Sequence, residues 1–236
     1  MEAFYALAVE DYRQMVAARP WAADLRTHAR DGRVRVLDVA CGSGKFPAEL
    51  MRRGLAAEID GMPVEVDLLD PSVFSLAEAR SVLGPPFLLR AEHAVRLQDL
   101  DPTVGGFDVA WATHALYAIP PAEIGDGVAR MAAALRPGGF GAIVHATTAS
   151  HYLRFAEAYR ATFAPETTPF TSAEQVTDAL RAAGVAPSSS TLRYTVGTSD
   201  RAVLEGFLQR CVFDDTVDLA AMETQEPARR VPRGLP

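Results

Sequence analysis

Apolar residues along the chain alternate between short continuous runs and stretches with helical spacing. The short runs are rich in Val, Leu, Ile and Phe, which is typical of strands buried in a parallel sheet. These runs cover residues 34–39, 64–70, 87–89, 107–112, 140–147 and 191–196. Helical patterns lie between them, at residues 45–53, 73–83, 122–135, 148–163 and 171–184, and again at 199–213. The alternation predicts an α/β fold with a doubly wound, mostly parallel, Rossmann-like sheet of six to seven strands.

The first 31 residues carry apolar side chains at helical intervals, and Pro20 separates two short helices. We expect this segment to form a helical N-terminal cap that covers the core. The alternative is a functional role for the same cap, in which Tyr5, Glu10 and Asp11 close over a small substrate. The sequence leaves both open.

The length of 236 residues predicts one domain, with an N-terminal cap at 1–31, an α/β core at 32–213 and a Pro/Arg-rich tail at 214–236. The tail contains no convincing seventh strand. Either residues 229–235 form an edge segment, which Pro232 disfavours, or the natural protein is longer than this chain.

Composition narrows the choice of partners. The net charge of −7 and the pI near 5.3 argue against nucleic acid and anionic membranes. The N-terminus carries acids where a signal peptide carries bases, and no apolar run approaches the ~20 residues of a membrane span. Cys41 and Cys211 lack metal-ligand spacing. We expect a cytoplasmic protein without a metal site or a membrane partner, and the sequence does not indicate its oligomeric state.

The apolar run at 34–39 ends in a glycine turn, Cys41-Gly42-Ser43-Gly44, and a helical pattern follows. A strand, a glycine turn and a helix in this order form a nucleotide-binding corner. Pro47 stands where the dinucleotide fingerprint needs its third glycine. Phe46 stands where a P-loop needs a hydroxyl. Neither motif is present.

What remains is Asp38 followed by Val-Ala-Cys-Gly-Ser-Gly, and this resembles motif I of the class I S-adenosylmethionine-dependent methyltransferases. The resemblance implies S-adenosylmethionine as cofactor and S-adenosylhomocysteine as its product. An acid at the tip of the second strand, Asp70, is placed to bind the adenosine ribose hydroxyls. Its alternative role is to cap the helix at 73–83, which Ser72 could equally do, and the two roles are compatible. Glu92 and His93 occupy the place of the polar pair that contacts adenine in this class. The expected cofactor-binding residues are Asp38, Ala40, Gly42, Gly44, Asp70, Pro71, Ser72, Glu92, His93 and Thr113.

The end of the fourth run should face the glycine corner, because ligands of open α/β sheets bind beyond the C-terminal strand ends. We therefore place the methyl acceptor beside His114 and Tyr117. His114, with an ordinary pKa near ~6.5, is the candidate base, and its alternative role is a hydrogen-bonded wall residue. Tyr117 presents a π-face to a cation or packs, and Tyr152 shapes an apolar pocket. His145 is a lesser candidate with a structural role.

Several short segments are similar to histamine N-methyltransferase and its relatives. They are Asp70-Pro71-Ser72, His114-Ala115-Leu116-Tyr117, Thr147-Thr148-Ala149-Ser150 and Leu204-Glu205-Gly206-Phe207-Leu208 with Cys211. In that family, position 114 is usually an amide that contacts the amine, so the histidine found here argues against histamine itself. The resemblance implies methyl transfer to a small molecule, with an amine nitrogen preferred as acceptor. The alternatives are O-methylation of a small phenol or carboxylate, and a protein that binds S-adenosylmethionine without turnover.

Overall fold

The computed structural model describes residues 2–214 of the chain. They group into two compact units, one of residues 11–194 and the other of residues 2–10 with residues 195–214. Helix α1 (Glu2–Ala17) contributes to both units, and α9 (Arg201–Val212) belongs to the second. The single-domain organisation stays a prediction. The predicted tail at 214–236 lies outside the described residues except for Asp214.

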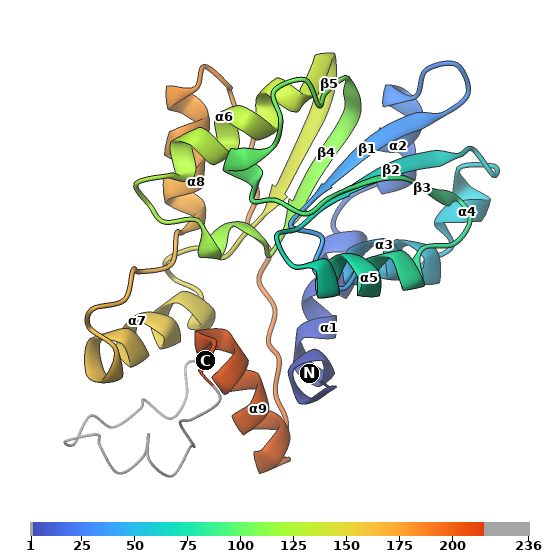
Figure 1. The fold of residues 1–236 in the computed structure, drawn as a ribbon. Coiled ribbons are helices and arrows are strands. Elements are labelled where there is room, and N and C mark those ends of the chain that lie inside the picture. Colours follow the sequence, from blue (N-terminus) through green and yellow to red (C-terminus); the bar gives the residue numbers. More distant parts are fainter. Residues whose placement is uncertain (1, 215–236) are drawn as a thin grey trace. The chain divides into compact units, whose positions relative to one another are not determined.

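A five-stranded parallel sheet forms the centre of the larger unit, in the order β3-β2-β1-β4-β5 (Figure 1). The strands are β1 (Val34–Val39), β2 (Val64–Leu69), β3 (Phe87–His93), β4 (Phe107–Thr113) and β5 (Leu135–Val144). This confirms the predicted parallel, Rossmann-like sheet. The predicted count of six to seven strands is not matched among the described residues. Residues 191–196 form no strand, and Leu192 and Tyr194 are exposed there. An alternating pattern makes a strand only where a neighbouring strand pairs with it.

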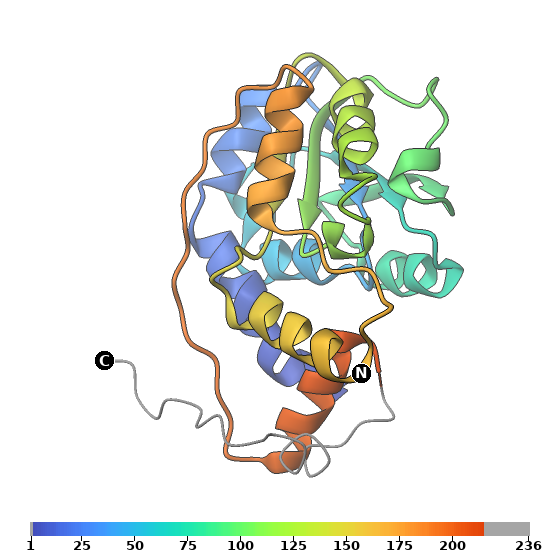
Figure 2. The same cartoon turned by 90° about the vertical axis from the view of Figure 1, so that its left-hand side faces the viewer.

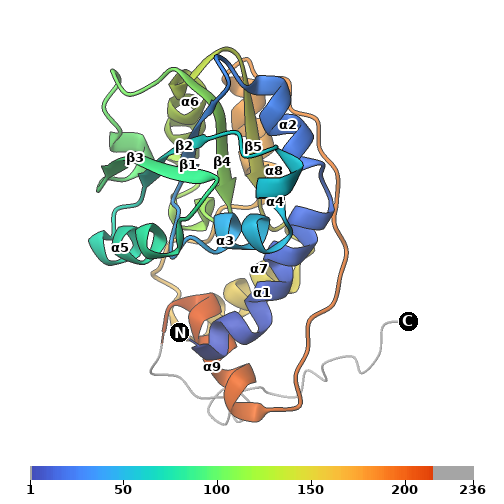
Figure 3. The same cartoon turned by 90° about the vertical axis from the view of Figure 1, so that its right-hand side faces the viewer.

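Alternate strand residues feed two apolar clusters, one on each face of the sheet. Val36 and Val66 pack into the first cluster, whereas Leu37 and Leu69 pack into the second. The first face is covered by α2 (Trp21–His28), α3 (Lys45–Arg52), α4 (Leu55–Glu58) and α5 (Val73–Val82), and Figure 3 shows α2 beside α4. The second face is covered by α6 (Ile124–Ala134) and α8 (Ala173–Ala182), which lie side by side in Figure 2. The larger unit also holds α7 (His151–Phe163) and the 3₁₀ turns η1 (Leu97–Asp99) and η2 (Leu116–Ala118).

The N-terminal segment differs from the predicted cap. Pro20 does separate two helices, as expected. Beyond it, Trp21 and Leu25 are buried in the first apolar cluster, and the Trp21 indole N–H donates to the Met15 carbonyl at 3.1 Å. Helix α2 is therefore part of the sheet packing, because its two large apolar side chains complete the core. Tyr5 and Glu10 belong to the smaller unit, so their closure over a substrate stays a prediction.

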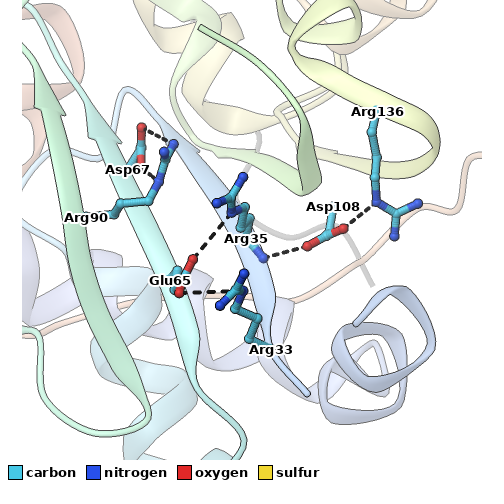
Figure 4. A network of polar contacts seen from close by, with 7 residues as sticks. All are labelled: Arg33, Arg35, Glu65, Asp67, Arg90, Asp108 and Arg136. Carbon is cyan, nitrogen blue, oxygen red and sulfur yellow. Dashed lines mark hydrogen bonds and ion pairs between the residues drawn. The ribbon is translucent and has the colours of Figure 1, made fainter. Parts of the chain in front are cut away.

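A network of charged side chains joins the beginnings of neighbouring strands (Figure 4). Asp108 of β4 accepts the Arg35 backbone N–H of β1 at 2.7 Å and pairs with Arg136 of β5. Arg136 also donates to the His28 carbonyl at 2.8 Å, and Glu65 of β2 pairs with Arg35 at 3.4 Å. These partners satisfy the buried Asp108 carboxylate at the N-terminal edge of the sheet. The opposite edge, where the strands end, is the edge at which ligands of such sheets bind.

Candidate functional site

Backbone hydrogen bonds join the C-terminal ends of the strands just where the predicted site residues begin. The Cys41 N–H donates to Leu69 O at 3.1 Å, and the Asp70 N–H donates to His93 O at 3.2 Å. On the other side of β1, Val39 is in register with Ala112, and the His114 N–H donates to Val144 O at 2.9 Å. The segments that carry the predicted donor and acceptor residues thus leave the sheet at one common edge.

The glycine corner after β1 contains three left-handed residues. Ala40, Gly42 and Gly44 have φ values of 48°, 52° and 70°. A Cβ at Gly44 would lie 2.5 Å from Val82 Cγ2, so this glycine permits α3 to pack closely against α5. A Cβ at Gly42 would meet nothing within 4 Å. Gly42 therefore leaves open space at the strand end, as a residue that faces a ligand should.

Asp70 holds the corner in place. Its Oδ2 accepts the Gly42 N–H at 3.0 Å, and its Oδ1 accepts the Ser72 N–H at 2.8 Å. Ser72, not Asp70, is the N-cap of α5, because the Ser72 hydroxyl accepts the Ser75 N–H at 3.2 Å. Each ionised carboxylate oxygen has a second acceptor site. Asp70 can therefore bind two ribose hydroxyls while it keeps both backbone bonds.

Asp38 is a buried acid at the end of β1. It is 1% exposed, and its Oδ2 has no hydrogen-bond partner among the described residues. Burial raises the pKa of Asp38 to about 8; the neighbouring Trp111 side chain lowers the pKa and the Asp70 charge raises it. A buried carboxyl oxygen without a partner is a site that a ligand donor group would satisfy. The ammonium of S-adenosylmethionine is such a donor.

Glu92 and His93, expected against adenine, already have partners in the protein. His93 Nε2 lies 2.8 Å from Asp67 Oδ2, and Asp67 also pairs with Arg90. Glu92 pairs with Arg80 at 3.2 Å. The two side chains thus help to fix β3 against β2 and α5.

An apolar cavity of about 150 Å³ lies at the C-terminal ends of β1 and β2, on the second face of the sheet. Its walls include Val39, Ala40, Leu69, Leu97 and Leu116. Such walls suit a flat ring system such as adenine. Ala40 was predicted as a site residue from the sequence, whereas Leu97 and Leu116 were not. Their apolar character alone did not distinguish them from core residues.

His114 follows β4 in a left-handed conformation, with φ of 51°. Its Nδ1 is hydrogen-bonded to the Tyr117 hydroxyl at 2.6 Å, and its Nε2 lies 3.7 Å from Asp11 Oδ2. The Tyr117 oxygen also accepts the Ala146 N–H at 3.0 Å. Burial lowers the pKa of His114 to about 4. The ring is therefore neutral at pH 7 and a weaker base than an ordinary histidine.

Tyr117 is the centre of a cluster of rings beside the ends of β4 and β5. Its ring centroid lies 3.9 Å from that of His145, 4.7 Å from Tyr152 and 6.1 Å from Phe170. The structure thus brings together the predicted acceptor residues Tyr117 and Tyr152, with His114 at the edge of the cluster. Sequence reasoning gave His145 a structural role and missed Phe170, whose place depends on the path of the connection between α7 and α8.

Within residues 2–214, no three His, Cys, Asp or Glu side chains are grouped so as to hold a metal ion. None of the helices in this part of the chain is long and apolar enough to cross a membrane.

Comparison with known proteins identifies the domain. Residues 36–139, less than half of the chain, match the family model of a methyltransferase domain. This segment runs from β1 to the beginning of β5 and contains the glycine corner, Asp70 and His114. The chain thus carries a methyltransferase domain of the kind that uses S-adenosylmethionine, which confirms the enzyme class and the cofactor expected from the sequence. No curated protein matches the chain.

Several solved structures are similar to the chain at low sequence identity. An O-methyltransferase family protein from Burkholderia thailandensis is 18% identical with a TM-score of 0.56, over 78% of this chain and 54% of that one. A possible histamine N-methyltransferase from Thermotoga maritima is 16% identical with a TM-score of 0.48, over 75% of this chain and 73% of the other. Magnesium protoporphyrin IX methyltransferase from Synechocystis, solved with S-adenosylhomocysteine, is 16% identical with a TM-score of 0.49, covering 79% and 80%. The Burkholderia match supports the fold alone.

Proposed function

We propose that this protein transfers a methyl group from S-adenosylmethionine to a nitrogen of a small-molecule amine. The donor supplies an electrophilic methyl group on a sulfonium. The residues around it need to hold donor and acceptor in line and to exclude water, and few other catalytic groups are required. Asp70 binds the ribose, Asp38 faces the ammonium, and Gly42 leaves room for the donor.

The observation that carries the amine assignment is the ring cluster around Tyr117 together with the Asp11 carboxylate beside it. The ring faces of Tyr117 and Tyr152 attract a basic amine. Asp11 lies at the edge of the same cluster, because its Oδ2 is 3.7 Å from His114 Nε2. His114 is neutral at pH 7, so it adds no positive charge that would repel such a substrate. We assign His114 a direct contact with the acceptor and Tyr117 a π-face.

The test is transfer of labelled methyl from S-adenosylmethionine to primary amines, imidazoles, phenols and carboxylates, with a titration of S-adenosylhomocysteine on the same sample. Label on amines supports the proposal. Label on phenols or carboxylates alone supports the O-methyltransferase alternative. Binding of S-adenosylhomocysteine with no labelled acceptor supports a protein that binds the cofactor without turnover.

Two variants test the division of labour between donor and acceptor residues. Asp70→Ala should weaken S-adenosylhomocysteine binding, because it removes the ribose acceptor. His114→Ala should lower turnover of the amine but leave S-adenosylhomocysteine binding within about threefold of wild type. A change of that size is smaller than the tenfold that about 1.4 kcal/mol produces. Equal losses of donor affinity in the two variants would contradict the assignment.

A further inference from the structure

His145, which follows β5 directly, is fixed in one protonation state by its surroundings. Its Nε2 lies 2.9 Å from the Thr171 carbonyl oxygen. A carbonyl oxygen only accepts hydrogen bonds, so Nε2 of the neutral ring carries the proton and Nδ1 carries the lone pair. Thr171 is itself held, because its hydroxyl donates to the Ile119 carbonyl at 2.5 Å. The tautomer of His145 is thus set by rigid, buried backbone.

The lone pair on His145 Nδ1 is buried and has no hydrogen-bond partner among the described residues. The two nitrogens of an imidazole point in divergent directions, so Nδ1 faces away from Thr171. A buried acceptor without a partner costs free energy that a ligand donor would recover. Burial lowers the pKa of His145 to about 4, a change that the Thr171 bond partly opposes, so the lone pair is available at pH 7.

His114 does not offer an equivalent lone pair. The Tyr117 oxygen accepts the Ala146 N–H, so we assign its own proton to the bond with His114 Nδ1. Burial raises the pKa of Tyr117 well above its usual value, so the phenol keeps that proton. His114 Nε2 then carries a hydrogen, and it is this N–H that lies 3.7 Å from the Asp11 carboxylate. Of the two histidines, His145 is therefore the one whose acceptor nitrogen has no hydrogen-bond partner among the described residues.

His145 also lies where the acceptor is expected. Its ring stacks on Tyr117 with centroids 3.9 Å apart, and Val144 before it receives the His114 N–H. We propose that His145 Nδ1 accepts a hydrogen bond from an N–H of the methyl acceptor, so that the site takes primary and secondary amines and rejects tertiary amines and carboxylates. This inference rests on the proposed function and adds a substrate class to it. Methylation of a primary amine should stop when the nitrogen has lost its last hydrogen.

Two variants separate the proposed contact from the structural bond to Thr171. His145→Gln keeps an N–H near the position of Nε2 and loses the acceptor at Nδ1. His145→Asn keeps an oxygen acceptor near Nδ1 and loses the bond to Thr171. We expect His145→Gln to lower kcat/KM for a primary amine about 10- to 100-fold relative to wild type. His145→Asn should keep most of the wild-type kcat/KM. Binding of S-adenosylhomocysteine should stay within about threefold of wild type in both, since neither changes a donor contact.

The opposite order, with His145→Gln fully active and His145→Asn impaired, would show that only the Thr171 bond matters and would overturn the inference. Nitrogen-15 NMR of histidine-labelled protein provides a readout without turnover. We expect the Nε2–H tautomer in the free protein and a shift of the Nδ1 signal when a primary amine is added with S-adenosylhomocysteine, but not when a tertiary amine is added. An unresponsive or protonated Nδ1 would overturn the inference. Failure of wild-type protein to label any amine would instead overturn the proposed function.

Discussion

Replacing Asp70 with asparagine tests the donor site most directly, because this carboxylate joins the glycine corner to the expected ribose. Asparagine can keep its oxygen on the Ser72 N–H, but it then places an NH₂ group against the Gly42 N–H. A hydrogen bond to a charged acceptor contributes about 1.5–3 kcal/mol. Loss of the Gly42 bond should lower the free energy of unfolding by about 2 kcal/mol.

The same change removes one acceptor from the ribose diol. A second loss of about 1.5–3 kcal/mol corresponds to roughly 10- to 100-fold weaker binding of S-adenosylhomocysteine. Glu65→Gln is the matched control, because Glu65 lies at the other end of β2 and pairs with Arg33 and Arg35. It should leave ligand binding unchanged.

Calorimetric titration and chemical denaturation of the same samples separate the two effects. A 2′-deoxyribose analogue of S-adenosylhomocysteine sharpens the comparison. Wild-type protein should bind the analogue more weakly than the parent ligand, whereas Asp70→Asn should distinguish the two much less. Equal discrimination in both proteins would show that Asp70 only braces the corner, and it would refute the ribose assignment.

Other predictions concern the corner and the buried acid. Gly44→Ala should lower the free energy of unfolding by about 2 kcal/mol or more, because the new Cβ meets Val82 at left-handed φ, whereas Gly42→Ala should cost about 1 kcal/mol and mainly weaken S-adenosylhomocysteine binding. Denaturation and titration of both variants check this, and the reverse ranking in stability would contradict it. For Asp38, the folded protein keeps a proton up to about pH 8 that the unfolded chain releases near 3.8, so the free energy of unfolding should fall as pH rises between these values. Asp38→Asn should remove this contribution to the pH dependence of stability, measured as the melting temperature at a series of pH values, and it should weaken S-adenosylhomocysteine binding. An unchanged dependence of the melting temperature on pH would show that Asp38 is not the group responsible.

The sheet was largely predictable, because buried parallel strands are short apolar runs bounded by glycine and proline. All five observed strands were identified from such runs. The bounds were less accurate: β5 begins at Leu135 because that residue pairs with Phe107, a contact that periodicity does not show. The segment at 191–196 has the alternation of a strand, but no strand pairs with it among residues 2–214. Pairing across the chain, not the local pattern, decides such cases.

The candidate site likewise contains residues that local sequence motifs predict and residues whose surroundings depend on contacts distant in the chain. Asp38, Gly42 and Asp70 lie within short motifs whose local geometry follows from the sequence. Glu92 and His93 were expected to face adenine, but their partners come from α5 and β2, and His93 meets Asp67 across 26 positions of the chain. The role we propose for His145 depends on the Thr171 carbonyl, and no sequence pattern shows where that carbonyl points.

The internal bonding of the glycine corner also bears on which molecules the site excludes. The backbone N–H groups of Cys41, Gly42 and Gly44 donate to Leu69, Asp70 and Cys41. Corners that cradle pyrophosphate keep such amides free for the anion. Here they are occupied, and the Asp70 carboxylate beside them repels negative charge. ATP and dinucleotides, which are polyanions, should therefore bind this corner weakly even where they are abundant. The corner would stay available to a ligand that carries a positive charge on sulfur.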